Sequence, residues 1–306
     1  MQKLKPFMLP IAMVIGLLLH NWMEYVAWAA PWLIFVMLLI TFCRINPAHL
    51  RFTRLTIFCL SAQLIGAAAV YIAFVGVSAD LAQGLMICFL CPTATAAPVI
   101  TGMLGGSVER VATYSLASNI AVALLAPPVF TLTGGSDIDF ATTTFTIASK
   151  VVPMIIAPLL TALILRQWFR PVHRALSEHQ SISFYVWAVS LIIVVGRAVS
   201  FVIQEPASMI PEMIALAVGA GVACVFQFVI GRRIGCRCGD RIAGAQGLGQ
   251  KNTVLAVWMA LTYLNPVASI APAAYIAWQN TINSIQLYHH ARRLRVEAKP
   301  YADGKR

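Results

Sequence analysis

Apolar residues dominate the chain in long blocks that short polar stretches separate. Each block holds roughly 20 residues, which is enough for a helix to cross a bilayer core of about 30 Å. Block length and hydropathy therefore predict an all-α membrane protein with ten transmembrane helices. The predicted spans cover roughly 7–22, 26–43, 54–76, 81–104, 109–132, 142–168, 182–203, 208–231, 241–263 and 267–289.

The composition supports a membrane protein. Of 306 residues, 59% are hydrophobic and only 11% are charged, whereas a soluble domain carries about 25% charged residues. The first apolar block has no small-x-small cleavage site before the next block, so we expect it to be a span and not a signal peptide. The seven cysteines are scattered, and the one close pair, Cys236 and Cys238, lacks the spacing of a zinc site.

Lysine and arginine mark alternate connections between the predicted spans. Such a one-sided distribution places those connections in the cytoplasm, together with both termini, and we expect the chain to lie in the cell's inner (plasma) membrane. The net charge of +11 is then a signal of orientation, and no nucleic-acid partner is expected. The one-sided basic residues are Lys3, Lys5, Arg44, Arg51, Arg54, Arg110, Arg166, Arg170, Arg174, Arg232, Arg233, Arg237, Arg241, Arg292, Arg293, Arg295, Lys299, Lys305 and Arg306.

Three basic residues stand outside this pattern. Arg197 lies near the outer end of its span, where its side chain can reach the headgroups. Lys150 and Lys251 lie about half-way along the sixth and ninth spans, and no acidic residue lies deep in any span. An ionisable group at membrane depth indicates a functional site.

Two spans are poor continuous helices. The fourth contains Pro92 and Pro98, and the ninth contains Gly244, Gly247 and Gly249. Either span alone fits a proline kink or a tightly packed glycine helix. Interruptions at matching positions of two five-span halves instead point to inverted repeats around a transport site. The predicted repeats are residues 1–135 and 136–306, the second carrying a basic cytoplasmic tail.

Three motifs carry a resemblance to a known family: "CPTATAAPVIT" (91–101), "GLGQKNTVLA" (247–256) and "PAAYIAWQNTINS" (272–284). With them the chain resembles the bile acid:sodium symporter family along nearly its whole length. The resemblance implies ten helices in two inverted repeats, with spans 1, 2, 6 and 7 forming a panel beside a six-span core. It implies that the broken fourth and ninth spans cross, that sodium binds behind the crossing, and that an amphipathic organic anion binds between panel and core.

The chain departs from the family where sodium would bind. The family's sodium-ligand Glu of span 9 aligns with Gly247 and its Gln with Lys251, while the Ser-Asn pair of span 4 aligns with Ala97 and Pro98. Gln63 is retained. Without a carboxylate, two cations at one site would repel each other strongly.

We therefore interpret the Lys251 ammonium as a tethered substitute for one sodium ion. It is expected to donate to Gln63, to carbonyls of the broken helices, and to Thr93 or Thr95. If Lys251 stays protonated, the protein is a sodium-independent facilitator or exchanger, and if burial lets the proton leave, transport is coupled to protons. The alternative is a Lys251 that stays hydrated in the cytoplasmic cavity.

The resemblance and the intramembrane polar residues together define the candidate site. Lys150 could pair with a substrate carboxylate, or it could reach a loop or a headgroup. In an ungapped reading of the fifth span, Ser115 retains one hydroxyl ligand and Val111 replaces the other. The predicted substrate-binding residues are Thr93, Thr95, Asn119, Lys150, Asn252 and Asn280, and the predicted coupling-ion site or its substitute comprises Gln63, Ser115, Gln250 and Lys251.

These features predict a secondary transporter of a small amphipathic organic anion that works by alternating access. A sodium-coupled symporter with altered sites and a transporter-derived sensor without flux are the alternatives. No catalytic motif is present, so we expect no enzyme activity. We expect no cofactor beyond Na⁺ or H⁺ as a coupling ion, partners limited to the bilayer and the anion, and a monomer or a homodimer. The sequence leaves the substrate and the direction of transport open.

Overall fold

The computed structural model describes residues 8–45, 51–94, 96–134, 139–178, 180–204 and 206–298. The described residues form helices joined by short turns, and their only extended pairing is one isolated bridge. The predicted all-helical class is confirmed. The predicted repeat boundary at 135–136 and the tail beyond 298 lie outside the described residues.

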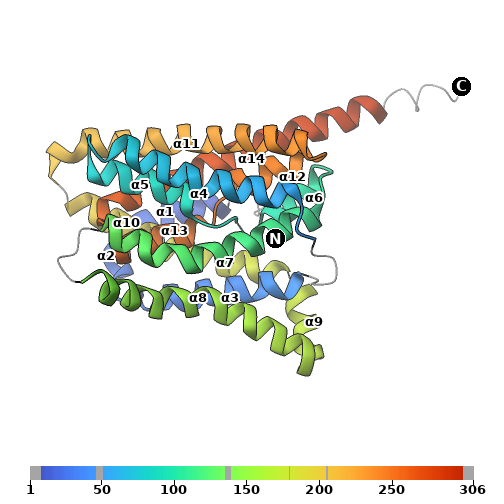
Figure 1. Cartoon of the computed structure of the whole chain (residues 1–306), viewed down its shortest axis with the longest axis horizontal. Helices are drawn as coiled ribbons and strands as arrows, with labels where there is room; N and C mark the ends of the chain where they lie inside the picture. The colour runs from blue at the N-terminus through green and yellow to red at the C-terminus, as the bar shows by residue number, and fades with distance from the viewer. Residues whose placement is uncertain are drawn as a thin grey trace, which may run out of the picture.

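The helices follow one another with few long connections (Figure 1). The first half of the chain forms α1 (Met8–Leu18), α2 (His20–Met23), α3 (Ala29–Arg44), α4 (Arg54–Phe74), α5 (Ala79–Leu90), α6 (Ala97–Met103) and α7 (Val108–Thr133). The second half forms α8 (Phe140–Trp168), α9 (Arg170–Glu178), α10 (Gln180–Gln204), α11 (Ile210–Arg237), α12 (Arg241–Gly249), α13 (Thr253–Tyr263) and α14 (Ile270–Ala298), with short 3-10 turns at Ala207–Met209 and Pro266–Ser269.

Several helices are long and apolar enough to cross a membrane. Among the described residues there are four, at Arg54–Phe74, Val108–Thr133, Phe140–Trp168 and Ala207–Arg237. Large apolar side chains such as Ile65 on α4 and Val222 on α11 are exposed, which suits a helix that faces lipid. The chain is therefore a multi-pass membrane protein, while the count of ten spans and the inverted repeats stay predictions.

Aromatic side chains gather around the connection between α2 and α3. Trp22, Tyr25, Trp28 and Trp32 are all largely exposed. Tryptophan and tyrosine favour the depth of the lipid headgroups. Close by, Arg197 forms an ion pair with the exposed Glu24 at 3.3 Å, and the headgroup contact of Arg197 stays a prediction.

The helices pack in two groups that meet along α7 and α13. One group contains α1, α2, α3, α8 and α10, and the other contains α4 to α7 and α11 to α14. In Figure 1, α11 and α14 lie along one side of the bundle, whereas α8 and α3 lie along the opposite side. The amphipathic helix α9, where we expected only a loop, has no buried residue and follows α8 directly.

Both interruptions that the sequence predicted are present. α5 ends at Leu90, Pro92 follows in an extended segment, and Pro98 occupies the first turn of α6. Proline suits that first turn, where a backbone donor has no helical partner. α12 ends at Gly249, and the side chain of Asn252 caps α13 by accepting from Leu255 N at 3.3 Å. The unwound segments therefore include residues 91–94 and residues 250–252.

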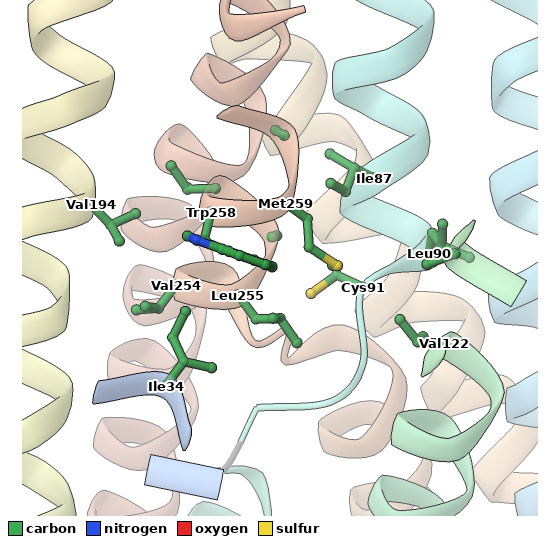
Figure 2. Close-up of a cluster of buried hydrophobic side chains, with 14 of the residues drawn as sticks. Ile34, Ile87, Leu90, Cys91, Val122, Val194, Val254, Leu255, Trp258 and Met259 are labelled. Atoms are coloured by element: carbon green, nitrogen blue, oxygen red, sulfur yellow. The ribbon is translucent and has the colours of Figure 1, made fainter. Parts of the chain in front are cut away.

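An apolar core packs against the crossing on the side of the first helix group. Figure 2 shows side chains from several helices converging there, among them Ile34 of α3, Val194 of α10, Val122 of α7 and Trp258 of α13. Such packing holds the two unwound segments between rigid helices.

Candidate functional site

The two unwound segments pair with each other as a short antiparallel bridge between Thr93 and Lys251. Ala94 N donates to Gln250 O at 3.1 Å, and Asn252 N donates to Pro92 O at 2.8 Å. Irregular backbone survives at membrane depth only where protein partners or a cavity satisfy it. The bridge provides such partners and fixes the two interrupted segments to one another.

Lys251 is buried at this bridge, with only 1% of its surface exposed. Its Nζ donates to Phe89 O at 2.8 Å, a carbonyl in the last turn of α5. The C-terminal end of a helix carries a partial negative charge and favours a cation. In the described part of the chain, no carboxylate forms an ion pair with Lys251. In this conformation the burial of Lys251 favours the substitute-cation interpretation over a hydrated side chain.

Gln279 of α14 holds the backbone of Lys251. Lys251 N donates to Gln279 Oε1 at 2.9 Å, and Gln279 Nε2 donates to Lys251 O at 3.3 Å. The side-chain amide thus takes the place of a neighbouring strand. It fixes the residue that carries the ammonium.

Gln63 of α4 satisfies the neighbouring carbonyls of α5. Its Nε2 donates to Leu90 O at 2.7 Å and to Cys91 O at 3.2 Å. Its Oε1 accepts from Tyr114 OH at 2.7 Å and from Ser118 Oγ at 2.8 Å. The Gln63 amide therefore donates two hydrogen bonds and accepts two, all with protein groups other than Lys251. Lys251 donates to Phe89 O instead.

Tyr114 of α7 occupies the space beside Gly247. A Cβ atom at position 247 would meet Tyr114 Cδ1 at 3.0 Å. The tyrosine ring is completely buried. Gly247 aligns with the sodium-ligand Glu of the resembling family, so an aromatic ring lies where that side chain would begin. Gly247 O accepts from Thr93 Oγ1 at 3.0 Å.

A second glutamine–tyrosine pair lies across the crossing. Gln227 of α11 donates to Cys88 O at 3.2 Å and to Tyr275 OH at 3.1 Å. Tyr275 OH in turn donates to Gly249 O at 2.8 Å, at the end of α12. This pair connects the ends of α5 and α12.

A chain of side-chain amides leads away from the crossing along α12. Gln250 Nε2 donates to Gln246 Oε1, and Gln246 Nε2 donates to Gln286 Oε1 of α14 at 2.6 Å. Two further amide atoms near the crossing segments, Asn252 Nδ2 and Asn119 Oδ1, are buried without a hydrogen-bond partner in the described part of the chain. A buried polar atom without a partner is unfavourable, so such atoms mark a candidate contact for a ligand.

Comparison with known proteins identifies the family. A model of the SBF-like CPA transporter family matches residues 22–281. The chain belongs to this family. No curated protein sequence matches the chain at a significant level. The predicted family is confirmed. Membership of the SBF-like CPA transporter family indicates a membrane transporter of this type and suggests that it is not an enzyme.

The structure brings together most of the polar residues predicted for this family member. Gln63, Thr93, Gln250, Lys251 and Asn252 all lie at the crossing, buried and hydrogen bonded. The two predicted residues of α7, Ser115 and Asn119, are also buried, and Asn119 Nδ2 donates to Ser115 O at 2.8 Å.

The remaining predicted residues lie apart or outside the described part of the chain. Lys150 is exposed on α8. Asn280 Nδ2 donates to Ile276 O within its own helix at 2.7 Å. Thr95 lies outside the described residues.

Sequence reasoning missed Gln279, Tyr114, Gln227, Tyr275 and Gln246, which all bond at or beside the crossing. Buried amides and phenols in otherwise apolar spans were the available signal. Gln279 and Asn280 are neighbours in the sequence, and adjacent helix residues point about 100° apart. Only the packing of α14 decides which of the two amides meets Lys251.

Proposed function

We propose that the protein is a secondary transporter that moves a small amphipathic organic anion by alternating access without sodium coupling, because the Lys251 ammonium takes the place of the coupling cation. The observation that carries this proposal is the 2.8 Å bond from Lys251 Nζ to Phe89 O at the end of α5. A helix C-terminus at membrane depth is a preferred position for a coupling cation in transporters with broken helices.

Electrostatics supports the absence of sodium at this position. Two unit charges 4 Å apart repel by about 4 kcal/mol at an effective dielectric constant of 20. No described carboxylate forms an ion pair with Lys251, and the Tyr114 ring lies against Gly247. The residues present therefore do not fit a sodium ion beside the ammonium.

Two features favour an anionic substrate. The N-terminus of α13 is directed at the crossing, and helix N-termini favour negative groups. Asn252 Nδ2, at that same N-terminus, is a buried donor without a partner in the described residues. In this proposal Lys150 on α8 supplies a positive charge for a substrate carboxylate. Both termini face the cytoplasm of a cell whose inner (plasma) membrane holds the protein, as the distribution of basic residues predicts.

The first test compares thermal stability in sodium and potassium at fixed ionic strength. Because a ligand that binds only the folded state raises the melting temperature, the wild-type protein should melt at the same temperature in both salts. Lys251→Gln, which restores the amide of the resembling family, should gain a sodium-dependent rise. Lys150→Gln is the matched control and should gain none. A sodium-dependent rise in the wild-type protein contradicts the proposal.

Flux in proteoliposomes separates the remaining possibilities. A panel of amphipathic carboxylates and sulfonates should include one anion that shows saturable uptake and counterflow without a sodium gradient. Uptake that follows an imposed pH gradient instead indicates proton coupling through Lys251. Binding without counterflow for every anion indicates a sensor, and uptake that requires sodium indicates a symporter with altered sites.

A further inference from the structure

A small cavity opens at the end of the bundle where α6 and α11 end and α12 begins. Its volume is about 230 Å³. Its polar wall consists of Arg232, Arg241, Gln286, His289 and His290, and its apolar wall consists of Leu104, Ile242 and Ile285. α6, α12 and α14 lie toward the same end of the bundle in Figure 1. Four helices thus contribute to one pocket.

The cavity is strongly basic. No aspartate or glutamate is among its lining residues, and neither arginine forms an ion pair with a carboxylate of the described residues. The neighbouring acid, Asp240, has other partners: its Oδ1 accepts from Ile242 N and Ala243 N, and its Oδ2 accepts from Ser107 N. Asp240 thus satisfies two N–H groups in the first turn of α12, and the cavity's side chains are the main donors left for an anion.

We propose that this cavity is a binding site for a phosphate group. Guanidinium groups bind phosphate through paired, charge-assisted hydrogen bonds. Arg232 and Arg241 provide two such groups from two helices, and His289, His290 and Gln286 add donors from a third. A volume of about 230 Å³ is below the 300 Å³ or so at which pockets for drug-sized ligands begin. The cavity thus matches the size of a phosphate ion or of a lipid headgroup phosphate.

Membrane orientation alone does not account for this arrangement. The positive-inside rule requires lysine and arginine near helix ends but no convergence on one pocket. Arg233 and Arg237 of α11 meet that requirement and do not line the cavity, although Arg232 and Arg241, which do line it, are equally exposed. The cavity instead combines two arginines with two histidines and an amide.

The site also has a direct connection to the crossing. Gln286, in the cavity wall, accepts from Gln246, which accepts from Gln250, the residue before Lys251. A phosphate would accept from Gln286 Nε2, while Gln286 Oε1 keeps its bond from Gln246, so one side-chain amide links the cavity to this chain. The cavity is therefore placed to influence the crossing as well as to bind an anion.

The experiment uses the purified full-length protein in lipid-free detergent. Potassium phosphate replaces potassium chloride at fixed ionic strength, and the melting temperature gives an apparent Kd. In Arg232→Gln/Arg241→Gln we expect the apparent Kd to rise at least about tenfold, because two charge-assisted hydrogen-bond donors are lost. Arg233→Gln/Arg237→Gln removes the same number of charges, both from the end of α11, and should leave the apparent Kd unchanged.

A second arm tests the lipid source of the phosphate. The wild-type protein and both double variants are reconstituted in nanodiscs of phosphatidylcholine with or without phosphatidylglycerol, and native mass spectrometry counts the retained lipids. Retention of phosphatidylglycerol that only Arg232→Gln/Arg241→Gln abolishes indicates a headgroup, whereas a response to inorganic phosphate alone indicates a soluble ion. His289→Asn/His290→Asn provides a further variant if the arginine variant does not fold. No response in either arm, or an equal loss in the two arginine variants, overturns the proposal.

Discussion

The carbonyl groups at the ends of α5 and α12 are satisfied by different kinds of side chain. Each helix stops at membrane depth and leaves carbonyl groups without helical partners. At α5 the partners include a charge: Lys251 Nζ bonds Phe89 O, and the amide of Gln63 bonds Leu90 O. At α12 the side-chain partners are neutral hydroxyls, Thr93 to Gly247 O and Tyr275 to Gly249 O.

The crossing therefore has a positive charge at the α5 end and none at the α12 end, although the backbones of the two unwound segments pair with each other. A cation adds favourable interaction with the helix end and a stronger hydrogen bond than a hydroxyl gives. We therefore expect the α5 end to depend on Lys251 far more than the α12 end depends on any one hydroxyl.

The largest effect should come from removal of the charge. Lys251→Met keeps an unbranched side chain but leaves Phe89 O without its partner, and should lower the free energy of unfolding by about 3 kcal/mol. Reversible denaturation in mixed micelles measures this change. Lys150→Met, on the exposed face of α8, is the control and should change it by less than about 0.5 kcal/mol. An equal loss of unfolding free energy in the two variants would mean that the α5 end does not depend on Lys251.

Loss of the α5 amide should have an intermediate effect. Gln63→Leu deletes the bonds to Leu90 O and Cys91 O and leaves the buried Tyr114 hydroxyl without its acceptor. We expect a destabilisation of about 2 kcal/mol. In a double-mutant cycle with Tyr114→Phe, the two changes should be non-additive by at least about 0.5 kcal/mol. Additive losses would mean that the Gln63–Tyr114 bond does not form.

The smallest effect should come from the α12 end. Thr93→Val preserves shape and removes one neutral hydrogen bond to Gly247 O, which should cost about 1 kcal/mol. Thr101→Val is the control, because Thr101 Oγ1 bonds only a carbonyl of its own helix, Ala97 O. If Thr93→Val destabilises the protein as much as Lys251→Met, the two helix ends are equivalent and the asymmetry is wrong.

The sequence predicted the interruptions and the residue at their centre, because proline, clustered glycine and an intramembrane lysine each have a direct physical reading. It did not predict which partners they meet. Lys251 was expected to donate to Gln63, yet Gln63 bonds two hydroxyls of α7 whose rotation no local pattern fixes. In the same way Asn280 was preferred to Gln279, although the packing of α14 turns Gln279 toward Lys251.

The cavity at the start of α12 could not be predicted from the sequence either. Its arginines were predicted only as markers of orientation, and His289 and His290 lie more than 40 residues along the chain from Arg241. Their convergence depends on the tertiary arrangement of α11, α12 and α14. Only the three-dimensional structure shows that Arg232 lines the cavity and that its neighbour Arg233 does not.

The covalent attachment of the Lys251 ammonium has a thermodynamic consequence. A dissolved coupling ion enters from one compartment and leaves into the other, so its electrochemical gradient does work worth about 2.3 kcal/mol per charge for each 100 mV. A side-chain cation that keeps its proton returns to its starting position in every cycle, so any displacement through the field is reversed and its net work is zero. Accumulation would then be limited by the gradient and the charge of the transported anion itself, and exchange of one anion for another of equal charge would generate no current.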